Sequence, residues 1–426
     1  MKNIDVLLFI EHKDRELEIT LAIAAQLREE FKLNVEIASL IFESYYAALR
    51  YTPKVVVTPS TAFGRGSASW IFYQIFGDRI TYVNMNYEQF ISSWKGKYKT
   101  PSHYMSVNRQ KQFVWGEYFA DVLNKGGISK ENIFHTGRPL SAVVKVKYKD
   151  RKDDDRSEIS KELGMLSNHK WHFVALTDGL AFATEEKIQS IIDNGAIEQG
   201  LRFHITQVKD TIEILIVWID KYIKSAKCND YFILRPHPSI SVSQYEKLII
   251  SILGYIPDNI KISKKYSGYK WLSACDNYFT NYSTLSIDAQ AMKKPLYIIT
   301  PNGSHKGEDY WWCDHGEKLI TFRDFSSAVT SSSDNPTVVK ISSNNLINGS
   351  LDGVLESAKY INEFALNRYQ VRSPHFASYL KPLIYNPRRV VGSLVRLLLS
   401  KHNKNIFNFV KPGIADDYLV SDDIGK

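Results

Sequence analysis

The sequence has little cysteine: three residues, Cys228, Cys275 and Cys313, among 426. So few thiols exclude a disulfide scaffold, and their spacing fits no zinc-binding motif. The sequence also lacks any run of about 20 apolar residues, which excludes a membrane-spanning helix. The apolar run Val6–Ile10 is too short for a signal peptide, and no small-residue cleavage site follows it, so we expect a cytoplasmic protein.

A strong charge of one sign is missing as well. Lys and Arg number 54 and Asp and Glu number 46, which gives a net charge of +8. This excess suits an anionic ligand or an anionic membrane surface. The sequence contains no helix-turn-helix, zinc-finger or aromatic-basic motif, so nucleic acid is not an expected partner. Apolar residues make up 44% of the chain, which is enough to bury a core without support from disulfides or metal ions.

Short apolar runs alternate with stretches of helical spacing along most of the chain. The predicted strands are Val6–Ile10, Val35–Ile37, Lys54–Thr58, Ile80–Val83, Gln112–Trp115, Asn132–Thr136, His172–Leu176, Tyr231–Leu234, Ile260–Ile262, Asn277–Phe279 and Leu296–Ile299. Strands that alternate with helices indicate βαβ units and parallel sheets. We therefore expect an α/β protein in which two Rossmann-like domains face a central cleft.

A charged segment, Lys147–Glu162, separates the two alternating blocks. It is dense in both charge signs and nearly free of apolar residues, which predicts a linker. Its acidic run, residues 153–155, has no strand before it, so we interpret it as solvated and expect no metal there. The expected domains are residues 1–150 and 160–345, followed by C-terminal helices at 350–426.

Ligands bind at the carboxyl ends of strands in open α/β sheets, and four polar clusters follow predicted strands. The first is the run of six polar residues Glu11–Glu16, in which Glu11, His12 and Arg15 are candidate substrate-binding residues. The alternative is a solvated helix N-terminus, where acidic residues complement the dipole. No glycine-rich turn is present here, which excludes a dinucleotide fingerprint.

The second cluster is Thr177-Asp178-Gly179. A carboxylate at Asp178 is a candidate base or nucleophile toward a hydroxyl. Gly179 lets the chain turn sharply beside a bound substrate. The alternative is an ordinary Asp-Gly turn.

The third cluster is Arg235-Pro236-His237-Pro238. Two prolines stiffen the loop, so the imidazole of His237 keeps a fixed direction. A fixed His beside Arg235 is suited to donate hydrogen bonds to a phosphate. A rigid exposed loop with an incidental His is the alternative.

The fourth cluster places Ser283 and Thr284 at the start of a predicted helix, Leu285–Met292. Hydroxyls and free backbone N–H groups at a helix N-terminus form an anion site. Simple N-capping by Ser283 is the alternative, and the two are compatible.

The order Asp-Gly, His-Pro and Ser-Ser/Thr resembles the motif order of bacterial sialyltransferases, polysialyltransferases and Kdo transferases. Here the motifs are Asp178-Gly179, His237-Pro238 and Ser283-Thr284. Those families are GT-B enzymes that use CMP-activated sugars. They often carry two acidic residues before the glycine, and Thr177 stands in the first of these positions here.

A wider likeness covers about residues 5–300. Segments Phe9–Lys13, Val114–Tyr118 and Thr136–Pro139 resemble a group of bacterial surface carbohydrate biosynthesis proteins. Segment Thr280–Pro295 is similar to the nucleotide-side segment of CDP-glycerol glycerophosphotransferases, which usually carry Asp where this chain has Asn281.

The resemblance implies a glycosyltransferase of bacterial capsule or lipopolysaccharide biosynthesis with a CMP-linked, Kdo- or sialic-type donor. The acceptor would be a glycan or lipid-linked glycan held by the N-terminal domain. No metal would be obligatory, because the leaving group is a monophosphate ester. Asp178 would deprotonate the acceptor in an inverting reaction or attack the anomeric carbon in a retaining one, and both stay open. The implied donor-site residues are Arg235, His237, Pro238, Ser283 and Thr284.

Three other interpretations stay open. A polyol-phosphate transferase would use CDP-glycerol or CDP-ribitol, and a UDP-sugar 2-epimerase would share the GT-B shape. A non-catalytic glycan-binding subunit would tolerate loss of Asp178.

The C-terminal stretch Asn386–Ser400 carries Val391, Leu394, Val395 and Leu398 on one helical face, with arginines interspersed. Such a helix packs on the body of the protein or lies on an anionic inner leaflet. Packing is preferred, because helices at this end of GT-B chains commonly cross back to the first domain.

Overall fold

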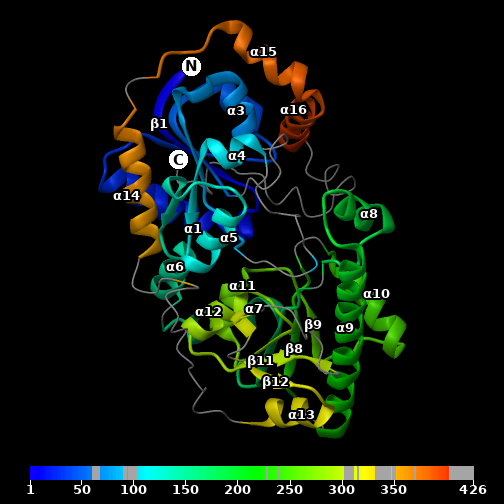
Figure 1. Ribbon diagram of the computed structural model, residues 1–426. Coiled ribbons are helices and arrows are strands. Elements are labelled where there is room, and N and C mark those ends of the chain that lie inside the picture. The colour runs from blue at the N-terminus through cyan, green and yellow to red at the C-terminus, as the bar shows by residue number, and fades with distance from the viewer. Residues whose placement is uncertain are drawn as a thin grey trace. The chain divides into compact units, whose positions relative to one another are not determined.

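The chain forms two compact units in the computed structural model (Figure 1). Unit 1 comprises Met1–Phe90, Lys99–Val143 and Ile341–Lys426, and unit 2 comprises Ile91–Tyr98 and Val144–Lys340. The structure describes residues 1–59, 68–89, 94, 103–148, 150–177, 179–226, 229–237, 240–301, 311–313, 316–331, 347, 352–368 and 371–402. Two predicted site residues, Asp178 and Pro238, lie outside the described residues.

Unit 1 is built on a parallel six-stranded sheet in the order β2-β1-β3-β4-β5-β6. Its strands are β1 (Lys2–Ile10), β2 (Val35–Ser39), β3 (Tyr51–Thr58), β4 (Thr81–Asn84), β5 (Gln110–Val114) and β6 (Ile133–His135). Val6 of β1 pairs with Val35 on one side and Val55 on the other. Residues 6–10 are all buried, as a continuous apolar run in a parallel sheet predicts.

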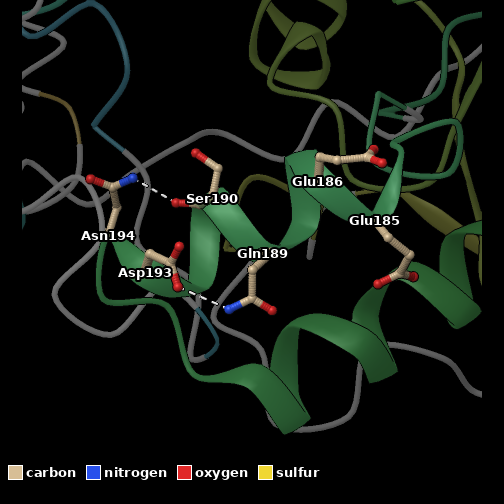
Figure 2. A pocket seen from close by; sticks show the side chains of 6 residues that line it. All are labelled: Glu185, Glu186, Gln189, Ser190, Asp193 and Asn194. Atoms are coloured by element: carbon tan, nitrogen blue, oxygen red, sulfur yellow. Dashed lines mark hydrogen bonds between the residues drawn. The ribbon is translucent and has the colours of Figure 1, made fainter.

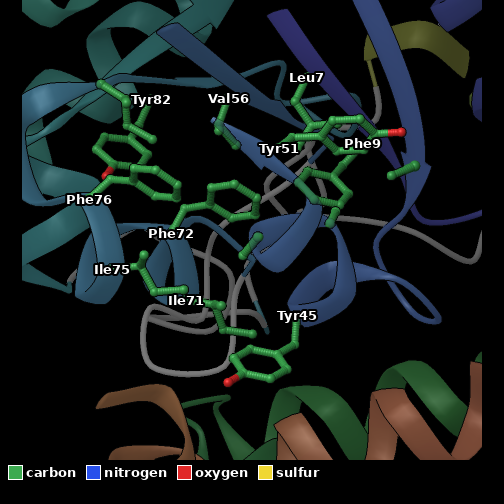
Figure 3. Packing of buried hydrophobic residues seen from close by; sticks show 14 of the residues in the cluster. Leu7, Phe9, Tyr45, Tyr51, Val56, Ile71, Phe72, Ile75, Phe76 and Tyr82 are labelled. Atoms are coloured by element: carbon green, nitrogen blue, oxygen red, sulfur yellow. The ribbon is translucent and has the colours of Figure 1, made fainter. Parts of the chain in front are cut away.

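The helices of unit 1 complete its core. They are α1 (Lys13–Glu29), α2 (Ser44–Arg50), α3 (Ala68–Phe76), α4 (Tyr104–Asn108), α5 (Glu117–Lys125), α14 (Gly353–Leu366), α15 (Phe376–Tyr385) and α16 (Pro387–His402). Helix α6 (Pro139–Lys147) runs from unit 1 into unit 2. Helix α14 packs on α1, α15 on α3 and α16 on α2. Figure 3 shows Leu7 and Phe9 of β1 packed with Phe72 of α3 in the main core cluster.

Unit 2 repeats this architecture with the strand order β12-β11-β10-β7-β8-β9, again all parallel. Its strands are β7 (Trp171–Val174), β8 (Tyr231–Leu234), β9 (Ile260–Ile262), β10 (Asn277–Thr280), β11 (Leu296–Ile299) and β12 (Glu317–Leu319). Its helices are α7 (Lys152–Leu163), α8 (Glu185–Asp193), α9 (Glu198–Ala226), α10 (Val242–Leu253), α11 (Gly268–Ala274), α12 (Leu285–Ala291) and α13 (Phe322–Thr330). Two parallel Rossmann-like sheets confirm the predicted α/β fold class.

The predicted linker at 147–162 is wrong, because most of it is helix α7 of unit 2. Ile159 is fully buried, and so is Asp155 of the acidic run that we interpreted as solvated. Asp153 and Asp154 of the same run are exposed, and the second buried charge of α7 is Arg156. Its guanidinium stacks on the Trp171 ring at 4.5 Å and donates to Asp276 Oδ2 at 3.0 Å, so tertiary ion pairs replace the missing apolar residues.

Candidate functional site

Three of the four predicted clusters follow three adjacent strands of unit 2. Strands β10, β7 and β8 are consecutive in the sheet, and Thr280-Asn281, Ala175 and Arg235 come directly at or after their ends. The carboxyl ends of parallel strands meet at one edge of a sheet. The topology therefore brings Thr177, the Arg235–His237 loop and the Asn281–Thr284 loop to a single edge.

Asn281 joins two of these loops. Its Oδ1 accepts from the backbone N–H groups of Thr177 at 2.9 Å and Tyr282 at 2.7 Å. Its Nδ2 donates to the Thr177 carbonyl at 3.5 Å. Asn281 is fully buried, and a carboxylate has no N–H for the last bond. The amide of Asn281 therefore makes a bond to the Thr177 carbonyl that the Asp usual in CDP-glycerol transferases could not make as a carboxylate.

Tyr282 adds a second connection to Thr177. Its hydroxyl donates to the Thr177 carbonyl at 2.9 Å and lies 2.9 Å from Nε2 of His204 on α9. The His204 ring in turn stacks on Trp94 at 5.3 Å. We call Thr177, His204, Asn281 and Tyr282 the Asn281 clamp. The side-chain amide of Asn281 and the hydroxyl of Tyr282 bond to Thr177, and His204 contacts the Tyr282 hydroxyl.

The loop after β8 is also held in place, through a bond from Arg235 to Tyr266, a residue with a strained backbone conformation. Arg235 Nη2 donates to the Tyr266 carbonyl at 3.4 Å. Tyr266 has φ +66°, a left-handed conformation that costs energy in a bulky residue. His237 is half-buried, and its carbonyl accepts from the Ile240 N–H at 2.8 Å. Arg235 and His237 therefore lie on a constrained loop at the same edge as Thr177.

The fourth cluster lies at the start of helix α12. The Ser283 hydroxyl accepts from the Leu285 N–H at 3.3 Å, while the Ser283 N–H donates to the Thr280 hydroxyl at 3.2 Å. Thr284 is half-buried at the start of α12. Ser283 thus bonds the first N–H of α12, whereas the N-cap residue Thr284 makes no side-chain capping bond. An anion at Ser283 and Thr284 stays a prediction. Gly179 is half-buried in the turn after residue 178.

The cluster after β1 lies in unit 1 and is built on Glu16, a member of the predicted polar run that was not among the predicted site residues. Glu16 is 3% exposed, and its Oε2 accepts from the N–H groups of Glu11 at 2.6 Å and His12 at 3.2 Å. Burial raises the pKa of Glu16 to about 7, although neighbouring Arg15 opposes the rise. Arg15 also donates to Glu88 Oε1 at 2.6 Å. We call Glu11, His12, Arg15, Glu16 and Glu88 the Glu16 cluster.

A hollow of about 560 Å³ in unit 2 lies elsewhere, on helix α8 (Figure 2). Its lining includes Glu185, Glu186 and Asp193 and none of the predicted site residues. Three carboxylates repel a phosphate, so this hollow is unsuited to a nucleotide. Among the described residues, no group of three or more His, Cys, Asp or Glu is placed to hold a metal ion.

No protein-family model and no curated protein matches the chain. Solved structures match its fold. The UDP-GlcNAc 2-epimerase of Methanocaldococcus jannaschii, in complex with UDP-GlcNAc and UDP, has a TM-score of 0.55 at 12% identity, covering 85% of this chain and 100% of that one. The UDP-GlcNAc 2-epimerase from Neisseria meningitidis has a TM-score of 0.50 at 10% identity, with coverages of 86% and 100%.

A variant of the wall teichoic acid polymerase TagF also matches, with a TM-score of 0.50 at 14% identity over 92% of this chain and 90% of that one. These identities are low, so the likeness concerns the fold alone. The chain has a GT-B-like fold.

Two residues that hold these sites were not among the predicted site residues. His204 lies in the second turn of α9 between Phe203 and Ile205, and its 2.9 Å contact with Tyr282 reveals its role. Glu16 belongs to the predicted polar cluster, but the sequence does not reveal that it is the buried member that accepts the backbone N–H groups of Glu11 and His12. Asn281 was the exception, because the transferases that segment 280–295 resembles usually carry Asp there.

Proposed function

We propose that the chain is a GT-B-like enzyme that handles a nucleotide-activated sugar or polyol phosphate, with the nucleotide at the carboxyl edge of the unit 2 sheet. The observation that carries this proposal is the convergence of three motif loops on adjacent strands β10, β7 and β8. An open α/β sheet binds ligands at this edge. The Asn281 clamp fixes one side of it and the strained loop at Tyr266 the other.

The proposed roles follow the chemistry of each group. Arg235 and His237 stabilise negative charge on the donor phosphate as the bond to it breaks. The hydroxyls of Ser283 and Thr284 complete the phosphate site. Asp178 deprotonates the acceptor hydroxyl or attacks the donor directly, and the clamp fixes Thr177, the residue before it.

Two donor classes compete within this proposal. Segment 280–295 and the likeness to TagF favour a cytidine diphosphate polyol. The order of the three motifs favours a CMP-linked acidic sugar. We put the CDP-polyol first, because a solved fold and a local motif point to it together, while the CMP-sugar rests on the motif order alone.

A UDP-sugar 2-epimerase is the second candidate function. The observation that favours it is the TM-score of 0.55 to an epimerase that is covered over its whole length. This candidate requires UDP binding and a sugar product that stays free of any acceptor.

Calorimetric titration with CMP, CDP, UMP and UDP, each with and without EDTA, tests the proposal. We expect cytidine nucleotides to bind wild type, and His237→Ala to weaken binding by about tenfold or more, since a charge-assisted hydrogen bond is lost. The matched control is His169→Ala, since His169 precedes β7 at the opposite edge of the sheet.

Each outcome has a distinct meaning. A preference for CDP supports the polyol-phosphate transferase, and a preference for CMP supports the sugar transferase. A preference for UDP supports the UDP-sugar 2-epimerase. Equal losses in His237→Ala and His169→Ala, or no nucleotide binding at all, would overturn the proposed site.

A further inference from the structure

Helices α15 and α16 of unit 1, coloured orange to red in Figure 1, expose an unusual amount of apolar surface. Eight of the large apolar side chains that are exposed in the described part of the chain lie on these two helices. They are Phe376, Leu380, Leu383, Ile384, Tyr385, Val391, Val395 and Leu398. By contrast, helix α9 is longer, with 29 residues, but exposes two large apolar side chains, Phe203 and Val217. Clustered exposure of this kind marks an interaction surface.

These side chains fall into two stripes at helical spacing. On α15, positions 376, 380, 383 and 384 share one face, and on α16 positions 391, 395 and 398 do. We call these the outer stripes. A helix packed on a core normally presents polar residues on its other face, so the outer stripes need a separate explanation.

The opposite faces of both helices are already used. Tyr379, Val390 and Leu397 are buried. The Tyr379 carbonyl accepts from the Tyr45 hydroxyl at 2.8 Å, and Arg396 Nε donates to the Ile41 carbonyl at 3.2 Å. Both helices are therefore fixed on unit 1, and their outer stripes cannot turn inward without breaking these contacts.

The charge around the outer stripes identifies the partner. Residues 371–402 contain six Lys and Arg and no Asp or Glu. Arg372 and Lys381 are exposed. Cationic residues beside an apolar face match the interface of an anionic bilayer, where the apolar face enters the acyl boundary and the cations meet the headgroups. A second copy of this chain fits poorly, because a two-fold interface sets identical, like-charged patches against each other.

We propose that the outer stripes of α15 and α16 dock unit 1 onto an anionic membrane surface. No helix within the described residues is long and apolar enough to cross a membrane, so the contact is with the bilayer face. Val391, Val395 and Leu398 enter the interface, and Arg372 and Lys381 contact lipid phosphates. This proposal does not depend on the reaction that the chain catalyses.

Sedimentation of the full chain with lipid vesicles tests the proposal. We expect binding to vesicles of phosphatidylethanolamine and phosphatidylglycerol, weak binding to phosphatidylcholine, and release at high ionic strength. The triple variant Val391→Gln, Val395→Gln, Leu398→Gln should bind at least about tenfold more weakly. Glutamine is a good helix former, so α16 should stay intact, which circular dichroism checks.

A matched control carries Phe203→Gln, Val217→Gln and Ile250→Gln, three exposed apolar residues on helices of unit 2. We expect it to bind vesicles within about twofold of wild type. If the α16 variant unfolds, the α15 variant Leu380→Gln, Leu383→Gln, Ile384→Gln takes its place. Arg372→Gln with Lys381→Gln should weaken binding by about tenfold, from loss of two headgroup contacts.

Four results would overturn the proposal. They are no binding to anionic vesicles, equal binding to neutral vesicles, equal losses in the α16 variant and the unit 2 control, and a dimer in the absence of lipid that the α16 variant converts to monomer. The last result would assign the outer stripes to self-association.

Discussion

The two units hold their strand-end loops with different chemistry. In unit 1 the Glu16 cluster relies on a buried carboxylate that accepts two backbone N–H bonds beside an arginine. In unit 2 the Asn281 clamp makes equivalent backbone bonds with a neutral amide. A buried ionisable group couples its loop to pH, whereas an amide does not titrate. We therefore expect unit 1 to respond to pH at its loop and the amide of unit 2 to hold its loop across the same range.

Removing the amide should have the largest effect. Asn281→Ala leaves the buried N–H groups of Thr177 and Tyr282 without their acceptor, at about 1–3 kcal/mol each, so we expect a loss of about 4 kcal/mol in unfolding free energy. Chemical unfolding measures the loss, and hydrogen exchange at residues 175–177 locates it. The control Asn277→Ala removes one side-chain bond to His172 and should cost about half as much. Equal losses of unfolding free energy in Asn281→Ala and Asn277→Ala would show that the Asn281 clamp contributes no more than one ordinary buried side-chain bond.

The carboxylate of unit 1 should make stability fall as pH rises. The pKa of Glu16 is raised from 4.5 to about 7 by burial, so between these values the folded chain keeps a proton that the unfolded chain has lost. The contribution of Glu16 to stability is then fully present below about pH 4.5 and falls by about 3 kcal/mol as pH rises through 7.

Glu16→Gln should remove this slope, because the amide keeps an oxygen for the N–H groups of Glu11 and His12 and does not titrate. Unfolding by urea at about pH 5 and about pH 8 measures the slope. Glu29→Gln, an exposed change on the same helix, should leave it unchanged. A slope that survives in Glu16→Gln would show that another group carries it, and the contrast between the units would fail.

The sequence predicted the buried central strands better than the edge strand β12 and the helix α7. Apolar runs such as Val6–Ile10 and Tyr231–Leu234 located the parallel strands, because residues buried on both faces of a sheet must be apolar. Strand β12 was missed, because Glu317-Lys318-Leu319 has one apolar residue and its edge position leaves the others exposed. Helix α7 was read as a linker, since composition does not reveal that Asp276 lies beside Arg156.

The candidate sites follow the same logic. Strand ends could be located from the sequence, and so could the loops that carry Thr177, His237 and Ser283. The partners that fix those loops come from distant segments, as Tyr282 meets His204 across 78 positions. Such contacts depend on the packing of α9 against the sheet and leave no local pattern.

The hydroxyl of Tyr282 supplies a smaller part of the clamp. Tyr282→Phe keeps the ring against His204 and removes the bonds to His204 and the Thr177 carbonyl, and we expect a loss of about 1.5 kcal/mol in unfolding free energy. Tyr297→Phe is the matched control, since its buried ring on β11 makes one hydroxyl bond, to Ser331 at 3.3 Å. An equal loss in both variants would mean that the Tyr282 hydroxyl acts as an ordinary buried phenol and adds nothing to the clamp.

The ion pair at the rim of the Glu16 cluster should contribute least, despite a shorter contact than any bond in the clamp. Arg15 Nη1 lies 2.6 Å from Glu88 Oε1, but the two side chains are 37% and 43% exposed. Water and salt screen such a pair, so Glu88→Gln should cost less than about 1 kcal/mol and less still at high salt. Glu185→Gln, which breaks the exposed pair with Arg202 in unit 2, should cost the same. If Glu88→Gln lowers the unfolding free energy by about 3 kcal/mol, as much as the pH change at Glu16 does, then Glu88 fixes the buried carboxylate through Arg15. The loop of unit 1 would in that case be held by a charge network rather than by one carboxylate.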